Sequence, residues 1–323
     1  HIWALDTVLE DITDMKISGA NTGIGNVLAN KGGIVVTLNY KKTRLTFLSA
    51  HMAAHEGESY YQARCDNIRN ILREAKTLGT SKKFDVAASS HHMFVLGDLN
   101  FRTKFGGENE HEDNVQRALE LIKAEDYESL YKFDELHQGI EDGDLLVGFE
   151  TLPCHFPPTF KVERQAGFVY MDQRTPSYTD RILFKSAEGL GGNLKALAYE
   201  PCVDFITSDH KPVRGAFSIV PNEIIRSFAS GRDIRLVFRN MQCSNIPASD
   251  LNGFSDPYLM FLWDSVDLTS GKTSFSDSVR QFLYGKSWPR TKYLPKSLNP
   301  KWEGQEMTLI LKANSMVGSD AML

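Results

Sequence analysis

The sequence predicts an α+β domain over residues 1–221, followed by a small all-β sandwich over residues 222–323. In the first part, β-branched and apolar runs alternate with amphipathic helical patterns, whereas the second part has strand-like runs without long helical periodicity. The charge changes as well, from 24 basic and 31 acidic side chains in the first part to 12 and 10 in the second. Turn-forming residues at 221–223 and 230–232 separate the two parts. A length of 323 residues also fits about two domains.

The first domain contains a predicted β-hairpin and a predicted helix. Residues 34–38 and 45–48 are β-branched or apolar runs, and the polar residues between them favour a turn. A helix is predicted over residues 58–77, because apolar side chains recur there every three or four positions. These side chains are Tyr61, Cys65, Ile68, Ile71, Leu72 and Ala75.

The remaining elements are predicted from shorter patterns. Residues 93–96 form an apolar run that predicts a buried strand leading into Gly97 and Asp98, and residues 112–130 have the pattern of a second amphipathic helix. Strands and helices around a shared sheet favour an α/β or α+β domain over a helix bundle. Further strands are predicted at 181–184 and 213–219 in the first domain and at 234–238, 257–263 and 307–311 in the second.

The composition excludes several classes of protein. A net charge of −5 argues against a general nucleic-acid binder, so we expect no nucleic-acid partner. No apolar run approaches the roughly 18 residues that a membrane span needs, and no N-terminal apolar signal segment is present. The four cysteines lie far apart without a Cys-x-x-Cys pair, which argues against a structural zinc site or a dense disulfide framework. We therefore expect a cytoplasmic protein.

Three short segments place polar residues where predicted strands end or begin. His51 follows one strand, Asp98 and Asn100 follow another, and Asp209 and His210 precede the last strand of the first domain. Polar residues at strand ends can converge above a sheet, where ligand sites commonly form. Taken singly, these residues have simpler interpretations. Asp98 and Asn100 can close a turn, because Asp and Asn bond readily to their own backbone, and a lone Asp–His pair can be a structural hydrogen-bonding pair.

A converged set of these residues suits the attack of water on a charged ester. A carboxylate such as Asp98 can take a proton from water, and an amide such as Asn100 can donate to a developing negative charge. His210 can donate as well if a carboxylate fixes its tautomer, and Asp180 is the candidate. No Ser–His or Cys–His nucleophile arrangement is present.

The glycine-rich segment before residue 34 does not match a nucleotide-binding loop. It lacks the third glycine of a dinucleotide fingerprint and the Gly-Lys-Ser/Thr of a P-loop. Two interpretations stay open: a tight turn that leads into the strand, or a site where Asn30 and Lys31 approach an anionic substrate. The neighbouring pair His91 and His92 is predicted to be solvated, with no metal bound.

Four segments in order resemble the inositol polyphosphate 5-phosphatases. They are residues 22–33 (TGIGNVLANKGG), 94–102 (FVLGDLNFR), 176–183 (PSYTDRIL) and 208–213 (SDHKPV). The resemblance spans residues 1–219 and implies the endonuclease/exonuclease/phosphatase fold, a four-layer sandwich of two mixed β-sheets flanked by helices. The family usually has Trp, Trp and Cys where this chain has Val95, Tyr178 and Thr179.

The resemblance also implies roles for individual residues. One aspartate activates the attacking water, an asparagine and two histidines hold the phosphoryl oxygens, and two further aspartates orient the histidines. A bound Mg²⁺ neutralises the charge of the 5-phosphate. By this resemblance Asp98 is the residue that activates water, and Asn100, His51 and His210 hold the phosphoryl oxygens. Asp180 and Asp209 orient the histidines.

A second set of residues is implied to bind the substrate. The family places a Tyr, two Lys and an Arg around the neighbouring 4-phosphate; here Lys161 and Arg174 match, Phe160 replaces the Tyr, and Asp172 stands in place of the second Lys. An acid in place of a base weakens a phosphate contact. The full implied set is Asn30, Lys31, Arg102, Lys161, Arg174 and Arg181.

The metal ligands of the family lie upstream of the Thr-Gly-Ile-Gly segment. Residues 1–21 contain no matching strand, and Glu10 falls in a predicted helical stretch where it is a solvated charge. We therefore expect that the sequence begins after the first strands of the domain and that the metal-binding Glu lies upstream of residue 1.

The second part resembles a C2 domain at residues 250–258 (DLNGFSDPY) and 297–302 (SLNPKW). The resemblance makes Asp250 and Asp256 candidate Ca²⁺ ligands, and the expected later Asp-x-Asp loop lies beyond the end of the sequence. Two carboxylates are too few for Ca²⁺, which takes six to eight oxygens, so the alternative is a Ca²⁺-independent C2 domain.

A basic and aromatic stretch in the second part predicts contact with an anionic membrane surface. Residues 280–302 carry six Lys or Arg and no acid, interleaved with Tyr284, Trp288, Tyr293 and Trp302. Each base near an anionic surface adds about 1 kcal/mol, and aromatic rings favour the interface. The alternative is a solvated loop with core aromatics.

The function predicted from the sequence is Mg²⁺-dependent removal of the 5-phosphate from inositides. The substrates are PI(4,5)P2 and PI(3,4,5)P3 at the cytosolic face of membranes, together with soluble inositol polyphosphates. Two alternatives stay open: a phosphoinositide-binding adaptor with an inactive phosphatase domain, and a nuclease or other phosphodiesterase of the same superfold. The acidic charge of the first domain argues against a nuclease.

Overall fold

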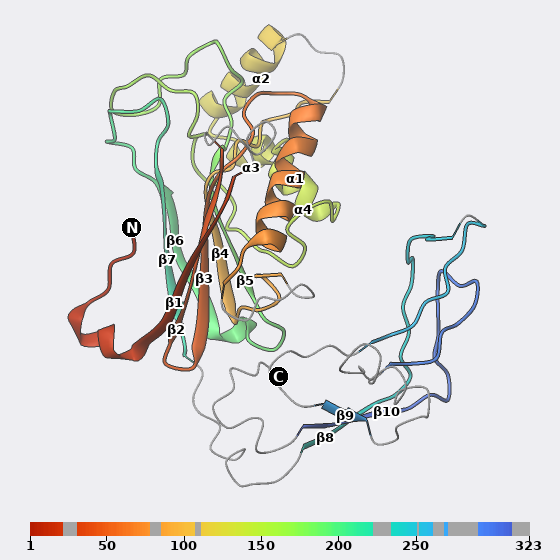
Figure 1. Ribbon diagram of the computed structural model, residues 1–323. Helices are drawn as coiled ribbons and strands as arrows, with labels where there is room; N and C mark the ends of the chain where they lie inside the picture. Colours follow the sequence, from red (N-terminus) through yellow and green to blue (C-terminus); the bar gives the residue numbers. More distant parts are fainter. Residues whose placement is uncertain are drawn as a thin grey trace. The chain divides into compact units, whose positions relative to one another are not determined.

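The computed structural model divides into two compact units, His1–Glu223 and Ile224–Leu323 (Figure 1). None of the helices in the described ranges is long and apolar enough to cross a bilayer. The structure describes residues 1–21, 31–77, 85–106, 111–221, 234–250, 252–260, 268–270 and 290–311.

A five-stranded mixed sheet forms the centre of the first unit, as the sequence predicts for an α+β domain. Its strands lie in sequence order, and each neighbouring pair is antiparallel except β3 and β4, which are parallel. The predicted hairpin is confirmed as β2 and β3, whose turn includes Lys41 at φ 54°. The strands are β1 (Ile12–Asn21), β2 (Gly32–Tyr40), β3 (Thr43–His51), β4 (His92–Asp98) and β5 (Asp180–Ser186).

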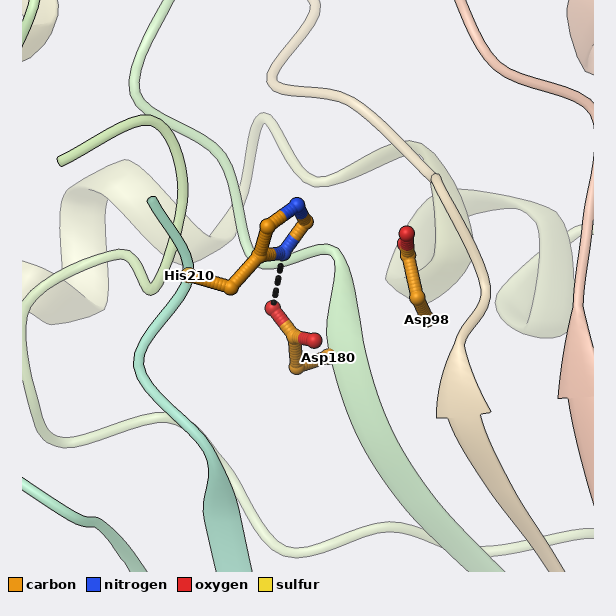
Figure 2. Close-up of side chains that lie close together, drawn as sticks. All are labelled: Asp98, Asp180 and His210. Atoms are coloured by element: carbon orange, nitrogen blue, oxygen red, sulfur yellow. Dashed lines mark hydrogen bonds and ion pairs between the residues drawn. The ribbon is translucent and has the colours of Figure 1, made fainter. Parts of the chain in front are cut away.

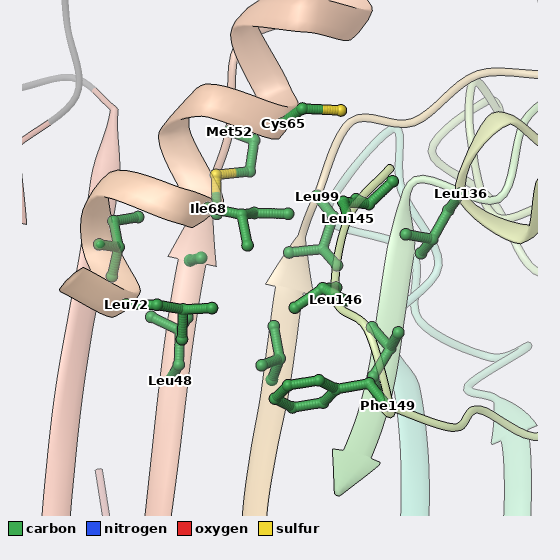
Figure 3. Packing of buried hydrophobic residues seen from close by; sticks show 14 of the residues in the cluster. Leu48, Met52, Cys65, Ile68, Leu72, Leu99, Leu136, Leu145, Leu146 and Phe149 are labelled. Carbon is green, nitrogen blue, oxygen red and sulfur yellow. The ribbon is translucent and has the colours of Figure 1, made fainter. Parts of the chain in front are cut away.

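Helix α1 (Glu58–Glu74) connects the parallel strands β3 and β4 and covers one face of the sheet (Figure 1). The apolar residues predicted from its periodicity are all buried. Figure 3 shows Ile68 and Leu72 of the helix above Leu48 of β3. Burial of this face stabilises the unit by roughly 1.5–3 kcal/mol for each large aliphatic side chain.

A second, two-stranded sheet packs on the other face through aromatic rings. It consists of the antiparallel strands β6 (Leu194–Pro201) and β7 (Val213–Ile219), joined to β5 through the short 3-10 helix η3 (Gly191–Asn193). The ring of Phe217 lies edge-on to Phe94 of β4 at 5.0 Å and to Phe184 of β5 at 5.4 Å. The sequence analysis missed β6, because its residues are half-buried or exposed and lack a clear apolar alternation.

The predicted helix over residues 112–130 is wrong as a single element. The chain forms α2 (His111–Lys123) and then a short α3 (Tyr127–Tyr131), followed by α4 (Glu135–Glu141). Glu125 breaks the helix with φ 55°, and the carboxylate of Asp126 caps α3 by accepting from the amide of Ser129. A capping aspartate inside an amphipathic pattern marks a helix start that periodicity alone does not show.

Two further expectations are corrected in this unit. Residues 1–21 contain the 3-10 helix η1 (Asp6–Asp11), which confirms the predicted helical stretch with an exposed Glu10, but they continue into the strand β1, which the sequence analysis missed. His92 is fully buried rather than solvated, because it lies in β4 with Nδ1 2.9 Å from the hydroxyl of Ser186. The half-buried His91 accepts a hydrogen bond from the amide of Arg44.

The described part of the second unit is a three-stranded antiparallel sheet. Its order is β8 (Ile234–Phe238), β10 (Met307–Leu311) and β9 (Leu268–Ser270), and two of these strands match predicted ones. Of the predicted strand 257–263, residues 261–263 lie outside the described residues, and Met260 forms an isolated bridge. The C2-like sandwich therefore stays a prediction.

Candidate active site

Each of three neighbouring strands carries a polar residue at the same end of the central sheet. His51 ends β3, Asp98 ends β4 and Asp180 begins β5. His51 lies opposite Asp98 in the sheet register, and Asp98 lies opposite Asp180. His210 reaches the same place from the segment before β7. The fold thus brings together four residues that the sequence predicted separately.

The position before Asp98 requires a glycine. Gly97 has a φ of 130°, a backbone conformation that residues with a side chain rarely adopt. A Cβ atom there would lie 2.1 Å from the carbonyl oxygen of Ala50 on β3. Because Gly97 has no side chain, β3 and β4 can approach closely where His51 and Asp98 leave the sheet.

His210 and Asp180 form the more enclosed of two histidine–aspartate pairs. Nδ1 of His210 lies 3.0 Å from Oδ2 of Asp180. The same oxygen accepts hydrogen bonds from the hydroxyls of Thr159 at 2.8 Å and Thr179 at 2.9 Å. The imidazole also packs against the ring of Phe160, with the centroids 4.5 Å apart. These contacts fix the carboxylate, which in turn places the imidazole proton on Nδ1.

His51 and Asp98 form the second pair, which is more open. Nε2 of His51 lies 3.3 Å from Oδ2 of Asp98, and about half of the His51 side chain is exposed. The amine of Lys31 contacts the same Nε2 atom. Burial lowers the pKa of Lys31, although the charge of Asp98 opposes this shift. Asn30, predicted beside Lys31, lies outside the described residues.

Asn100 follows Asp98 by two residues and is buried. It adopts a left-handed backbone conformation with φ 59°, which asparagine tolerates better than most residues. Its amide N–H donates to Oδ1 of Asp98 at 3.1 Å, and its side-chain Nδ2 donates to the carbonyl of Met52 at 3.2 Å. Arg102 donates to its side-chain oxygen at 2.5 Å. The segment therefore forms a turn, as the simpler interpretation predicts, and the same turn places Asn100 against Asp98.

The charges of the site shift two pKa values in opposite directions. Burial works against the ionised carboxylate of Asp98, but the hydrogen bond from His51 and the charge of His210 outweigh it, so the pKa lies below its ordinary value. Burial also works against protonated His210, but Asp180, Asp98 and Asp209 together raise its pKa. An ionised Asp98 therefore faces a histidine that stays protonated more readily than usual.

Asp98, Asp180 and His210 can also hold a metal ion. One ligand atom from each lies within 4.8 Å of the others, and they are the only such group of three or more among the residues that the structure describes. Figure 2 shows Asp180 bonded to one ring nitrogen of His210, with the side chain of Asp98 beside this pair. The two carboxylates fit Mg²⁺, which proteins bind through one or two carboxylates plus waters and phosphate oxygens.

Two predicted substrate-binding residues converge on one glutamine. Nζ of Lys161 donates to the side chain of Gln173 at 2.7 Å, and Arg174 donates to the carbonyl of Gln173 at 3.0 Å. Both hydrogen bonds are exposed. Phe160 precedes Lys161, so this basic segment continues directly from the residue that packs against His210.

The two other predicted substrate-binding arginines are buried. Arg181 is 1% exposed and pairs with the carboxylate of Asp134 at 2.5 Å. Arg102 is 3% exposed and bonds to Asn100. Asp209 was predicted to orient a histidine. Its charge helps to raise the pKa of His210, and its main-chain carbonyl accepts a hydrogen bond from the amide of Val162 at 3.0 Å.

The sequence analysis did not identify several residues that support the site. They are Thr159, Thr179, the network partners Arg64 and Glu135, and Phe160 in its contact with His210. Thr179 bonds to the adjacent Asp180, but the partners of the others lie 21 or more residues away in the chain, so no local spacing marks those residues. The one available signal was Thr179, which departs from the residue usual in the resembling family.

The candidate Ca²⁺ ligands of the second unit belong to no metal-binding group within the described ranges. Oδ1 of Asp256 accepts a hydrogen bond from the amide of Lys296 at 2.8 Å, and Asp250 is exposed in a turn closed by Gly253. Trp302 is 1% exposed and its indole donates to the carbonyl of Lys292, so it cannot anchor to a membrane surface. Tyr293 is 64% exposed. Tyr284 and Trp288 lie outside the described residues.

Residues 1–216 match the model of a protein family described as endonuclease/exonuclease/phosphatase family 2. The chain belongs to this family. The match covers most of the first unit, including every residue of the candidate active site.

Similar proteins are inositide 5-phosphatases. Over 325 aligned residues, the chain is 27% identical to the phosphatidylinositol 3,4,5-trisphosphate 5-phosphatase 2A of Danio rerio, an alignment that covers 96% of this chain and 25% of the relative. It is 30% identical to the human phosphatidylinositol 3,4,5-trisphosphate 5-phosphatase 2 over 219 residues, which are 64% of this chain and 16% of the relative. The chain thus spans a quarter or less of the length of these relatives.

Solved structures show that the fold is shared by proteins with different roles. The inositol polyphosphate 5-phosphatase domain of spSynaptojanin, in complex with inositol (1,4)-bisphosphate and a calcium ion, matches with a TM-score of 0.53 at 23% identity, over 66% of this chain and 58% of that one. A Cimex nitrophorin in its ferrous NO complex matches with a TM-score of 0.52 at 21% identity, over 67% and 68%. These likenesses establish the fold, and the chemistry has to be argued from the site.

Proposed function

We propose that the protein is a Mg²⁺-dependent inositide 5-phosphatase that acts on PI(4,5)P2, PI(3,4,5)P3 and soluble inositol polyphosphates. The observation that carries the proposal is the convergence of His51, Asp98, Asn100, Asp180 and His210 at one end of the central sheet. Family membership and the 27–30% identity to two 3,4,5-trisphosphate 5-phosphatases support it.

The side chains divide the chemistry among them. Asp98, with its lowered pKa, is ionised at neutral pH and accepts the proton of the attacking water. His210 is held by Asp180 and donates to a phosphoryl oxygen, and Nδ2 of Asn100 keeps one N–H for the same task. A divalent cation beside the carboxylates of Asp98 and Asp180 would neutralise phosphoryl charge. His210 would not be one of its ligands in this arrangement, because its ring nitrogens bond to Asp180 and to the phosphoryl oxygen.

The second unit is proposed to bring the enzyme to anionic membranes as a C2-like domain. The exposed Tyr293 with its neighbours Lys292 and Lys296 supports this, whereas the buried Trp302 reduces the number of anchors. Replacement of Tyr293 by Ala should lower co-sedimentation with vesicles that contain phosphatidylserine. Unchanged co-sedimentation would remove this residue from the membrane contact.

Phosphate release tests the proposed activity. The full-length natural protein is incubated with Mg²⁺ and vesicles carrying a 4,5-bisphosphorylated or a 3,4,5-trisphosphorylated inositol lipid, beside a His210→Ala variant. His155→Ala is the matched control, because His155 is an exposed histidine outside the site. Release that is lost only in His210→Ala would establish the phosphatase and rank its substrates.

The same experiment separates the alternatives. No release from either lipid, with binding to the vesicles retained, would favour a phosphoinositide-binding adaptor. The nitrophorin likeness shows that this fold also occurs in a protein that binds NO, so an inactive relative is a concrete alternative.

A further inference from the structure

We propose that Arg102 is a positioning residue that locks the side-chain amide of Asn100 in the orientation needed to donate to the phosphoryl group. The inference rests on the proposed function for the role of Asn100. It replaces the sequence-based expectation that Arg102 binds the substrate directly. The guanidinium is buried, with 3% of the residue exposed.

The contacts of Asn100 select one of two amide orientations. Nη2 of Arg102 lies 2.5 Å from the side-chain oxygen of Asn100, and the side-chain nitrogen lies 3.2 Å from the carbonyl oxygen of Met52. A guanidinium only donates and a carbonyl only accepts. A flipped amide would therefore set donor against donor at Arg102 and acceptor against acceptor at Met52. In the remaining orientation one N–H of Nδ2 bonds to Met52, and the proposal assigns the second N–H to the phosphoryl group.

Arg102 also supports the backbone of Asn100. Its Nε donates to the carbonyl oxygen of Asn100 at 3.0 Å, so two nitrogens of one guanidinium bond to the same residue. This residue has φ 59°, a conformation that needs support from its surroundings. Arg102 is thus bonded to both the main chain and the side chain of Asn100.

A buried charge network fixes Arg102 in turn. Its amide N–H donates to Oε2 of Glu135 on α4 at 2.9 Å, and the same oxygen pairs with Arg64 of α1 at 2.6 Å. Arg64 then donates to the carbonyls of Ala53 and His55, in the segment that follows His51. The network therefore connects the loop after β3 with the loop after β4, which carry different parts of the site.

The remaining contacts of the guanidinium agree with an indirect role. It lies 4.8 Å from the centroid of the Phe160 ring, which packs against His210. Nη1 is buried and has no hydrogen-bond partner among the described residues. A direct contact of Nη1 with the substrate is the competing interpretation, and the experiment has to separate the two.

A double-mutant cycle separates them. Phosphate release by the full-length protein is measured for Arg102→Met, Asn100→Ala and the double variant. We expect Arg102→Met to lower kcat by about 10- to 100-fold with KM nearly unchanged, since loss of a preorganised donor costs about 100- to 1,000-fold. We expect the double variant to be no slower than Asn100→Ala, because Arg102 acts through Asn100. The proposal would be overturned if the double variant lost the product of the two single losses in kcat. It would also be overturned if Arg102→Met raised KM at normal kcat.

Controls separate this role from loss of the fold. Arg73→Met removes an arginine whose side chain is 73% exposed and should leave kcat unchanged. Arg102→Lys keeps the charge and one donor, so it should recover part of the rate lost in Arg102→Met. If Arg102→Met and Arg102→Lys both unfold, Arg102 is needed for the stability of the fold, and the positioning role is overturned.

A spectroscopic measurement tests the positioning independently of turnover. The side-chain amide resonances of Asn100 are assigned by their loss in Asn100→Ala and compared between the natural protein and Arg102→Lys. A changed shift of the Nδ2 protons supports the lock, and unchanged resonances overturn it. Absence of phosphate release in the natural protein would contradict the proposed function and leave this test of Arg102 intact.

Discussion

The two histidine–aspartate pairs of the site differ in how many contacts hold them. His210 and Asp180 are 25% and 19% exposed, and Asp180 accepts two threonine hydroxyls in addition to the imidazole. His51 is 51% exposed, and its ring contacts Asp98 and Lys31 from the solvent side. The first pair is thus held by more contacts than the second, whose histidine is the more exposed of the two. Fixed donors stabilise developing charge without reorganising during the reaction.

The largest expected effect comes from Asp98, which belongs to the open pair. Asp98→Ala should lower turnover by at least about 100-fold, because it removes the proposed acceptor of the water proton. The fold should be nearly unchanged, since the residue lies at a strand end. Phosphate release and thermal unfolding measure the two properties. A folded variant with normal turnover would remove Asp98 from the mechanism.

Removal of the charge from the enclosed pair should change the pH profile. Asp180 contributes most to the raised pKa of His210, against the effect of burial. A group with a raised pKa stays protonated to higher pH, so kcat/KM in the natural protein should fall only as pH rises through that raised value. Asp180→Asn should move this fall to lower pH by about one unit or more.

The profiles of Asp180→Asn and of the natural protein are compared between pH 5 and 9. Lys195→Gln serves as the charge control, because Lys195 is exposed on β6, outside the site. An unmoved alkaline limb in Asp180→Asn would show that the limb belongs to another group.

A smaller effect is expected from the hydroxyls that hold Asp180. Thr179→Val removes one hydrogen bond of 2.9 Å and keeps the shape of the side chain. A hydrogen bond of this kind contributes about 1 kcal/mol, so kcat should fall about fivefold. Thr179→Ser should restore most of the rate, because it returns the hydroxyl. Equal rates for the Val and Ser variants would contradict the proposed constraint on Asp180.

The smallest effect is expected on the open side, at Lys31. Lys31→Met should raise KM by about threefold and leave kcat nearly unchanged, because a partly exposed amine attracts an anionic substrate weakly. The difference between the variants should shrink in higher salt, since screening reduces such attractions. A large loss of kcat would mean that Lys31 acts in the chemistry and that the two pairs are more alike than their exposure indicates.

The sequence predicted those parts of the fold that local patterns encode. The helical period identified the buried side of α1 from Tyr61 to Ala75, and two apolar runs identified the hairpin of β2 and β3. It failed where a single capping residue mattered, as at Asp126, and where a strand has little apolar alternation, as in β6. Such strands form because neighbouring strands supply partners, which the local sequence does not show.

The candidate site divides in the same way. Residues in compact motifs, such as Asp98 and Asn100, were identified because the motif contains both. The hydroxyl of Thr159 was not, since its contact with Asp180 depends on the packing of two distant segments. The contact between the Arg102 guanidinium and the Asn100 side chain was also not predictable, because the sequence does not show which partner a guanidinium bonds to.

The close approach of Gly97 to Ala50 has a consequence for evolution in the laboratory. A Cβ at position 97 would overlap the Ala50 carbonyl, which belongs to rigid main chain that cannot rotate away. In a library randomised at this codon and selected for phosphate release, glycine should therefore be the sole survivor.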